Sequence, residues 1–349
     1  MIHHLLITLI KDVNSLESKQ NLIRQGNLAT LSQLLFKQGS ALKAEMATAT
    51  KMSVVTINAL IKELLEEGIV TEGLPVQQSL GRPALNYHFN YNQSYYLLLS
   101  IQADLTLTPQ KLIIVAKIVN LAGEEAYAKT FDYSEVTLSR LLEIIQLTLE
   151  QPLTIAKIAL ALPGKVANDL VQSSYADLFN GWNIAAELKK VTDIPLAIQN
   201  DAHLLTMGSL IKQQIKATGP IVGIFYPEKS MPGITIAANG RIFEGVNGLA
   251  GEAKYLPSLI DRPVPNHGLE LKANLLEIIA IYNAVIVPEI FLISSDSLEE
   301  AEIMETIASS PLLNKQPNKP RFQMIGDFQD TLTFGLRWLA SLDTLYLLS

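Results

Sequence analysis

The 349-residue sequence contains no cysteine, which excludes disulfides, cysteine-based zinc sites and cysteine nucleophiles. Its five histidines are scattered and show none of the spacings of a zinc site, so we expect no metal and no cofactor. Long apolar runs are also missing, because none approaches the roughly 18 residues that a membrane-spanning helix needs. We therefore expect no membrane contact.

The first apolar run, from Leu5 to Ile10, does not have the features of a secretion signal. It is short, no Lys or Arg precedes it, and no small-residue cleavage pattern follows it. We expect no signal peptide, and the absence of cysteine is compatible with a reducing compartment. The expected location is the cytoplasm.

Positive charge is scarce overall, since the formal net charge is −7. A chain of this sign does not coat nucleic acid non-specifically. The charge is uneven, however. Residues 1–90 contain eight Lys/Arg and seven Asp/Glu, so this part carries +1 and the remainder −8. A near-neutral head on an acidic body allows specific DNA binding by the head.

Three helices and two short strands are predicted in the head. Leucines at helical spacing in 21–38 predict the first helix. Ser40 is a candidate cap for the second, and Ser53 for the third, SVVTINALIKELLEEG, which ends at Gly68. Two strands around a Pro/Gly loop follow. This order is typical of a winged helix-turn-helix.

In such a motif, the third helix lies in the major groove and its N-terminal side chains meet the base edges. Asn suits adenine, while the methyl groups of Val and Thr suit thymine. Lysines could hold phosphates, and an arginine in the wing could reach phosphate or the minor groove. The alternative is a three-helix module for dimerisation or docking, which the apolar, Arg-poor third helix also fits. The candidate DNA-binding residues are Lys51, Ser53, Val54, Thr56, Asn58, Lys62 and Arg82.

From Tyr95 onward, the pattern changes to strands that alternate with helices, which predicts an α/β body. An Asn239-Gly240 pair predicts a tight hairpin turn. Two segments rich in Pro, Asn and Ser, 256–268 and 309–321, are expected to be loops. The predicted strands are 95–101, 112–119, 155–161, 195–198 and 220–226, and the predicted helices are 135–149, 183–191 and 202–216.

Several segments of the chain share residue types, spacing and order with a known family. They are LALPGKV (160–166), NGWNIAAELKKVTDIPLAIQNDAH (180–203) and ANGRIFEGVNGLAGEAKYLP (238–257), preceded by GRPALNYHFN at the end of the head. Together they make the sequence similar to the ROK family of repressors, open reading frames and sugar kinases, especially its xylose-repressor-like members. The resemblance covers nearly the whole chain from about residue 20.

This resemblance implies an actin-like, ribonuclease-H-like duplicated α/β body with a sugar cleft between its halves. It implies that Asn200, Asp201 and Glu252 face sugar hydroxyls, with Asp201 at the position of the kinases' base. It also implies that Gly164 allows close approach of the backbone to the ligand. A competing interpretation makes Asp201 only a helix cap and Asn200 only a strand end. Glu252 could likewise pair only with Lys254.

The departures from the family pattern argue against catalysis. The stretch SIQADLTLTPQK (100–111) has no glycine where kinases need a phosphate loop. YPEKSMPG (226–233) replaces the second phosphate loop with two prolines, which lack an N–H, and with the anionic Glu228. The zinc-binding histidine and cysteines of the family are also missing. We expect no catalytic residue and no enzyme.

The sequence therefore predicts a DNA-binding transcriptional regulator, expected to be a repressor of carbohydrate-related genes. Residues 1–90 would form the winged helix-turn-helix with an N-terminal extension, 91–218 the first α/β lobe and 219–349 the second. The body would be a sugar sensor or only a dimerisation platform. The expected partners are a double-stranded DNA operator, a second copy in a homodimer and, if the body is a sensor, a sugar effector. The alternatives are a sugar kinase and a protein-interaction module that does not bind DNA.

Overall fold

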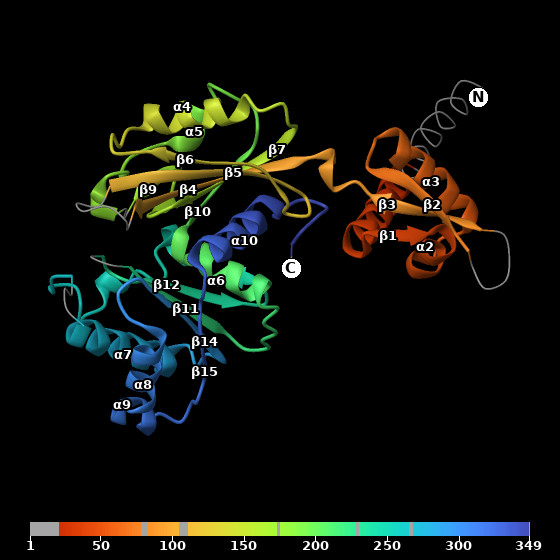
Figure 1. The fold of residues 1–349 in the computed structure, drawn as a ribbon. Coiled ribbons are helices and arrows are strands. Elements are labelled where there is room, and N and C mark those ends of the chain that lie inside the picture. Colours follow the sequence, from red (N-terminus) through yellow and green to blue (C-terminus); the bar gives the residue numbers. More distant parts are fainter. Residues whose placement is uncertain are drawn as a thin grey trace, which may run out of the picture. The chain divides into compact units, whose positions relative to one another are not determined.

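The computed structural model describes residues 21–77, 83–104, 111–172, 175–227, 230–264 and 268–348 (Figure 1). The chain divides into two compact units. The first, called the head below, contains the described residues up to Ser94, together with Asn120–Ala122 and Asp343–Leu347. The second, called the body, contains the rest of the described residues. None of the described helices is long and apolar enough to cross a membrane.

The described residues of the head form three helices and a small antiparallel sheet with the strand order β1-β3-β2. Its core includes the fully buried side chains of Leu31, Leu35, Ile57 and Leu64, which the helical spacing of the sequence brings onto facing sides. The elements are a helix over 21–38, β1 (Ser40–Leu42), α2 (Lys43–Thr50), α3 (Val54–Glu66), β2 (Val70–Val76), β3 (Ala84–Phe89) and a 3-10 turn (Tyr91–Gln93).

The expected cap of the second helix is wrong. Ser40 belongs to β1, where its partner on β3 is His88. The residue before α2 is Leu42, whose backbone N–H donates to the Glu45 carboxylate at 2.8 Å. The cap of α3 is as predicted, since Ser53 Oγ accepts a hydrogen bond from a backbone N–H of the first helical turn at 3.1 Å.

The first sheet of the body has the strand order β10-β7-β4-β5-β6. Helices α4 and α5 pack on one of its faces, where Leu99, Ile114, Ile144 and Leu160 belong to one apolar core. The bounds are β4 (Tyr95–Asp104), β5 (Lys111–Asn120), β6 (Glu125–Asp132), α4 (Leu138–Leu149), β7 (Ile155–Leu162), β8 (Lys165–Ala167), β9 (Leu170–Gln172), a 3-10 turn (Tyr175–Asp177), α5 (Ile184–Leu188) and β10 (Leu196–Asn200).

The second sheet has the strand order β13-β12-β11-β14-β15. This is the same arrangement as in the first sheet when that sheet is followed from its other edge, as β6-β5-β4-β7-β10. In both sheets, three consecutive strands are extended by two parallel strands that each follow a helical segment. The bounds are β11 (Ile221–Tyr226), β12 (Gly233–Ala238), β13 (Arg241–Ile242), two 3-10 turns (Val246–Gly248 and Ala253–Tyr255), α7 (Gly268–Val285), β14 (Ile290–Ser295), α8 (Glu300–Ala308), α9 (Pro311–Lys315) and β15 (Arg321–Met324).

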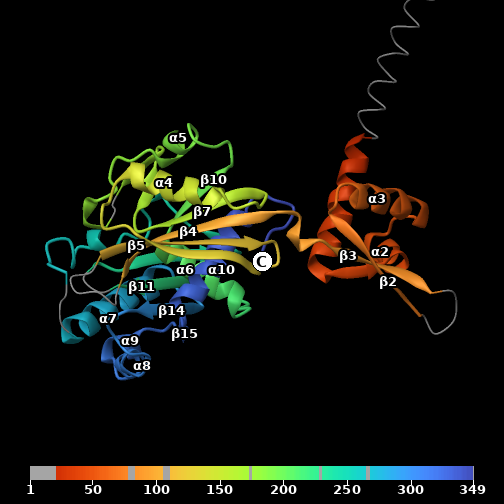
Figure 2. The same cartoon turned by 45° about the horizontal axis from the view of Figure 1, so that its top comes forward.

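Helices α6 (Asp201–Lys212) and α10 (Phe328–Ser341) lie against each other between the two sheets (Figure 1 and Figure 2). Their backbones cross very closely, because a Cβ built on Gly335 would overlap with the Leu204 carbonyl oxygen. Helix α10 also packs on β4 and β7, while α6 packs on β11 and β12. The pair therefore couples the two sheets of the body.

Some of the predicted elements differ from the structure. Helix α9 lies inside the expected loop 309–321, where Ser310 Oγ accepts from the Leu313 N–H and Pro311 occupies the first turn. Strands β6, β14 and β15 have no counterpart among the predicted strands. The edge strand β6 is mostly exposed and polar, so it lacks the apolar signal that predicts the central strands.

Candidate functional site

A cleft of about 810 Å³ opens in the body where several strands end. The carboxyl ends of β4, β7, β10 and β11 supply much of its lining, together with the first residues of α6 and α10. Such strand ends are where α/β folds bind their ligands. The volume is that of a site for a small molecule.

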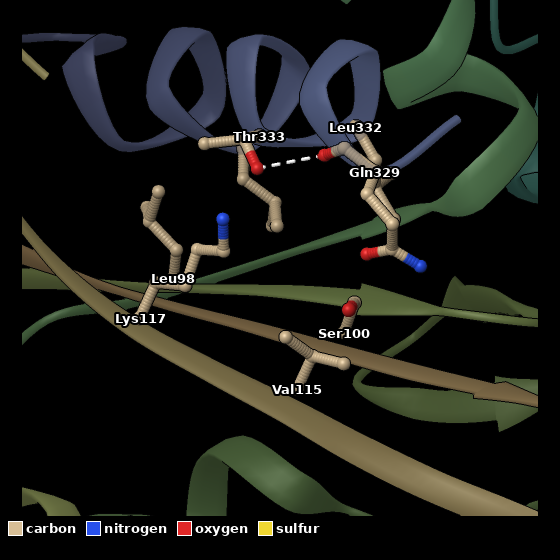
Figure 3. Close-up of a pocket in the computed structure, with 8 residues that line it drawn as sticks. Leu98, Ser100, Val115, Lys117, Gln329, Leu332 and Thr333 are labelled. Carbon is tan, nitrogen blue, oxygen red and sulfur yellow. Dashed lines mark hydrogen bonds between the residues drawn. The ribbon is translucent and has the colours of Figure 1, made fainter. Parts of the chain in front are cut away.

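A second, much smaller void lies between α10 and the sheet (Figure 3). Leu98, Ser100 and Val115 reach it from β4 and β5, and Gln329 and Thr333 from α10. Its volume is about 10 Å³, which is room for about one water molecule. We therefore regard the larger cleft as the candidate functional site.

All four predicted ligand-binding residues line this cleft: Gly164, Asn200, Asp201 and Glu252. The parallel pairing of β10 with β7 places Asn200 opposite Leu162, two residues before Gly164. The side-chain amide of Asn200 donates to the Gly164 carbonyl oxygen at 3.2 Å. One hydrogen bond thus connects the ends of two neighbouring strands at the cleft.

The helix cap is Asn200, which corrects the interpretation of Asp201 as the cap. Asn200 Oδ1 accepts from the Ala202 N–H at 3.0 Å, and its backbone precedes α6 in an extended conformation. Asp201 is the first helical residue, and its Oδ1 accepts from the same N–H at 2.8 Å. Its carboxyl group therefore lies at the helix N-terminus, where the helix dipole stabilises negative charge.

Asp201 is nevertheless difficult to ionise. Burial raises its pKa to about 7, and the nearby carboxylates of Asp296 and Glu252 act in the same direction. The hydrogen bond from Ala202 lowers the pKa but does not compensate for the burial. A carboxyl group with this pKa can both donate and accept hydrogen bonds near neutral pH.

Glu252 is held by a buried cation that sequence reasoning missed. Lys165 Nζ lies 3.7 Å from Glu252 Oε1 and donates to the Ala250 carbonyl oxygen at 2.7 Å. Only 6% of the Lys165 side chain is exposed, and burial lowers its pKa. The predicted partner of Glu252 is also present, since Lys254 Nζ lies 3.8 Å from Oε2.

His203, two residues after Asp201, is buried beside this ion pair. Its exposed fraction is 2%, its Nδ1 lies 3.0 Å from Gln199 Oε1, and its Nε2 lies 3.4 Å from Lys165 Nζ. Burial and the positive charge of Lys165 lower its pKa to about 3, so the imidazole is neutral near pH 7. A neutral ring that donates through Nδ1 can accept through Nε2 from Lys165.

No group of three or more His, Asp or Glu suited to a metal ion occurs in the part of the chain that the structure describes. Glu228, which the sequence places in the altered second phosphate loop, lies outside the described residues.

Four of the seven predicted DNA-binding residues lie in the short turn between α2 and α3 or in the first turn of α3: Lys51, Ser53, Val54 and Thr56. Lys51 occupies this turn with a positive φ of 58°, and Ser53 and Thr56 bond to each other through their hydroxyl oxygens at 2.9 Å. Asn58 and Lys62 are exposed on α3, where Lys62 Nζ lies 3.8 Å from the Glu66 carboxylate. Arg82 lies outside the described residues.

The most exposed apolar side chain at the start of α3 is one that the sequence analysis does not select. Val55 is 79% exposed and Val54 is 54% exposed. Helical spacing places Val55, Asn58, Ala59 and Lys62 on one exposed face. The helical period of the buried residues could have identified this face, because it is opposite to them. These buried residues are Ile57, Leu60, Ile61 and Leu64.

Comparison with known proteins gives a family for the body. Residues 107–257 match the model of the ROK family. The chain therefore contains a ROK family domain over these residues, as the resemblance predicted. No curated protein sequence matches the chain.

Solved structures with the same fold include both regulators and kinases. A ROK family transcriptional regulator described as a homolog of the E. coli MLC protein is 18% identical with a TM-score of 0.63, over 90% of this chain and 95% of that one. A putative N-acetylmannosamine kinase from Listeria monocytogenes is 15% identical with a TM-score of 0.53, over 70% and 97%. A ROK family protein from Streptococcus pneumoniae in complex with sucrose is 14% identical with a TM-score of 0.55, over 70% and 96%. At these identities the likeness establishes a sugar-kinase-like ROK fold.

Proposed function

We propose that the protein is a DNA-binding transcriptional regulator, and specifically a repressor of carbohydrate-related genes that acts in the cytoplasm as a homodimer. The observation that supports this proposal is the arrangement of two helices in the head. Its helices α2 and α3 are separated by three residues, and the first turns of α3 expose Val54, Val55 and Asn58. A helix-turn-helix places its second helix in the major groove in this way.

We assign residues 1–90 as a winged helix-turn-helix with an N-terminal extension. The hairpin β2–β3 would be the wing, since it pairs antiparallel and follows α3 directly. The 18% identical ROK regulator shares its fold with this chain over 90% of the residues, which supports the assignment. Ser53 would contribute mainly through its cap. Val54, Thr56 and Asn58 would meet base edges. Lys51 and Lys62 would hold phosphates, and Arg82 would reach phosphate or the minor groove.

We propose that the body senses a small molecule without phosphorylating it. Residues 91–218 and 219–349 would be its two lobes. The cleft would bind a sugar through its hydroxyl groups, at Gly164, Asn200, Asp201 and Glu252. A ligand that binds one arrangement of the lobes more tightly than another would shift the arrangement of the paired heads. This shift would change operator affinity, because half-sites are separated by whole turns of DNA.

The test is a fluorescence-anisotropy titration of the full chain against its own upstream intergenic DNA and a shuffled control. Salt at about 150 mM suppresses non-specific phosphate binding. We expect a preference of about a hundredfold or more for the specific DNA, and release on addition of the effector. Equal weak binding, followed by failure to select any sequence from a random pool, would reject DNA recognition.

The exposed Val54 and Val55 favour a second candidate, a head that docks on a partner protein. Apolar side chains at this exposure suit a protein contact as well as thymine methyl groups. The random-pool selection separates DNA binding from protein docking, because a docking head would enrich no DNA sequence.

A coupled assay of ADP release across hexoses, pentoses and amino sugars tests the absence of kinase activity.

A further inference from the structure

The wall of the cleft is strongly acidic. Six lining residues carry a carboxyl group, whereas Lys254 is the only lysine or arginine among the lining residues that the structure describes. The acids come from both repeats of the body and from segments far apart in the sequence. They are Asp104, Asp177, Asp201, Glu252, Asp296 and Asp327.

Three of these carboxylates have neutral hydrogen-bond donors. Asp201 accepts from the backbone N–H of the next residue at 2.8 Å, and Asp327 from the backbone N–H three residues further on at 3.1 Å. Asp177 accepts from the side-chain amide of Asn180 at 2.8 Å. Such neutral donors fix the orientation of a carboxyl group and bring no positive charge that would offset a negative one.

Two ammonium groups beside the cleft approach the same acid. Lys165 and Lys254 lie 3.7 and 3.8 Å from the two oxygens of Glu252. The acids also act on one another inside the cleft, since Asp296 helps to raise the pKa of Asp201. Carboxylates that disfavour each other's ionisation stabilise a cation placed among them.

The shape of the cleft adds a second constraint. Its volume is about 810 Å³, and apolar side chains such as Ile101, Phe225 and Val264 lie among its acids. A bare metal ion would leave this apolar surface uncovered. A ring with apolar faces and polar edges would cover the surface and still reach the carboxylates.

We propose that the cleft selects a cationic polyol, namely a sugar with a free, protonated amino group, over neutral, N-acetylated and phosphorylated sugars. This inference rests on the proposed function, because it names the effector class of the same site. The amino group would replace one hydroxyl and lie among the carboxylates, while the remaining hydroxyls would donate to Asn200 Oδ1 and Glu252. A phosphate would meet like charge, so sugar phosphates and nucleotides are excluded.

Isothermal titration calorimetry at about pH 6.5 tests the preference with the full chain. The probes are glucose, glucosamine, N-acetylglucosamine and glucosamine 6-phosphate, with the matching galactose and mannose series to cover stereochemistry. In the series that binds, we expect the free amine to bind at least roughly tenfold more tightly than the parent and the N-acetyl sugar. The advantage should shrink as salt rises from about 50 to 500 mM.

Substitutions of single cleft carboxylates test which of them cause the preference for the free amine. Asp296→Asn and Asp177→Asn should each reduce the advantage of the amine severalfold and change the affinity for the neutral sugar less. Two variants are used so that a fold defect in one does not decide the result. Asp261→Asn is the matched control, since Asp261 is exposed and does not line the cleft.

The outcomes separate this inference from the proposed function. If a neutral or N-acetylated sugar binds as tightly as the free amine, the cationic preference is overturned and the sensor stands. If no sugar of any charge binds, the preference and the sensor role both fail, while selective DNA binding by the head would still support a regulator.

Discussion

Lys165 on β8 and Glu252 at the cleft form a buried ion pair, with 3.7 Å between Nζ and Oε1. The same ammonium group donates to the Ala250 carbonyl oxygen at 2.7 Å and lies 3.4 Å from the His203 ring. It therefore connects the β8–β9 hairpin with the loop that contains Ala250 and Glu252, and with helix α6. A proposed ligand-binding carboxylate is thus positioned by a residue that does not line the cleft.

Removing the positive charge of Lys165 alone should destabilise the body more than removing the charges of both Lys165 and Glu252. In Lys165→Met, Glu252 and the Ala250 carbonyl oxygen lose a buried partner, and we expect a loss of about 3 kcal/mol in the free energy of unfolding. The double variant Lys165→Met/Glu252→Gln should recover part of this loss. Urea denaturation of the single and double variants measures the coupling. A single variant as stable as the parent protein would contradict the structural role of the pair.

Asp201 should make stability depend on pH. Its pKa in the folded protein is about 7, against 3.8 for the ordinary group, so the folded state binds the proton more tightly than the unfolded state. Its contribution is therefore fully present below about pH 4 and is lost as the pH rises through about 7. At about 1.4 kcal/mol per pKa unit, the loss is at most about 4 kcal/mol.

The variant Asp201→Asn cannot ionise and should lack this dependence. Its stability relative to the parent protein should increase from pH 5 to pH 8, as measured by chemical denaturation at both values. Asp261→Asn, at an exposed site outside the cleft, serves as the control. A parallel pH profile for Asp201→Asn and the parent protein would show that the carboxyl group ionises as readily in the folded chain as in the unfolded one.

Features with a local signal could be predicted from the sequence. The apolar period of α3, its Ser53 cap and the apolar central strands such as β4 and β11 are local properties of the chain, and they correspond to the structure. The hairpin turn predicted at Asn239 and Gly240 is another local property, and both residues have a positive φ in the structure. The residues at the cleft were predicted from the family resemblance. Their gathering in one cleft required the pairing of β10 with β7, which no local pattern specifies.

The features that could not be predicted depend on long-range packing. Lys165 follows a Pro-Gly turn and has no local sign of burial, because its partner carbonyl is 85 residues away. The acids Asp296 and Asp327 follow β14 and β15, which have no counterpart among the predicted strands, although the apolar residues of β14 are a local signal for a buried strand. The carboxyl-rich character of the cleft therefore becomes visible only when the second sheet is in place.

A methyl group added at the crossing of α6 and α10 should be strongly destabilising. In Gly335→Ala, the new Cβ would overlap with the Leu204 carbonyl oxygen, so the helices must separate. We expect a loss of at least about 2 kcal/mol, as for other overpacked interiors. Gly26→Ala is the matched control, because Gly26 lies in a helix with no atom within 4 Å of the new Cβ.

The control Gly26→Ala should instead increase the free energy of unfolding, since alanine stabilises an open helical position by about 0.5–1 kcal/mol relative to glycine. Thermal unfolding monitored by circular dichroism should therefore show a lower midpoint for Gly335→Ala and an unchanged or higher one for Gly26→Ala. An unchanged midpoint for Gly335→Ala would mean that the two helices do not cross as closely as described.

Helix α3 gives the sharpest test of the proposed DNA contacts. Thr56→Ala combined with Asn58→Ala removes two proposed base-reading side chains and leaves the buried face of the helix intact. Loss of base contacts should cost specific binding about 1–3 kcal/mol for each good contact and leave non-specific binding unchanged. Lys62→Ala should instead weaken binding to all sequences and reduce the slope of log affinity against log salt by about 1.

Anisotropy titrations at several salt concentrations, with a selected and a shuffled sequence, measure both effects. The control is Glu305→Ala, an exposed substitution on α8 of the body. If the double variant kept its preference for the selected sequence, α3 would not be the reading helix, whatever the affinity of the chain for DNA. If Lys62→Ala changed specificity and not the salt slope, the lysine would contact a base edge, most simply the O6 and N7 acceptors of guanine.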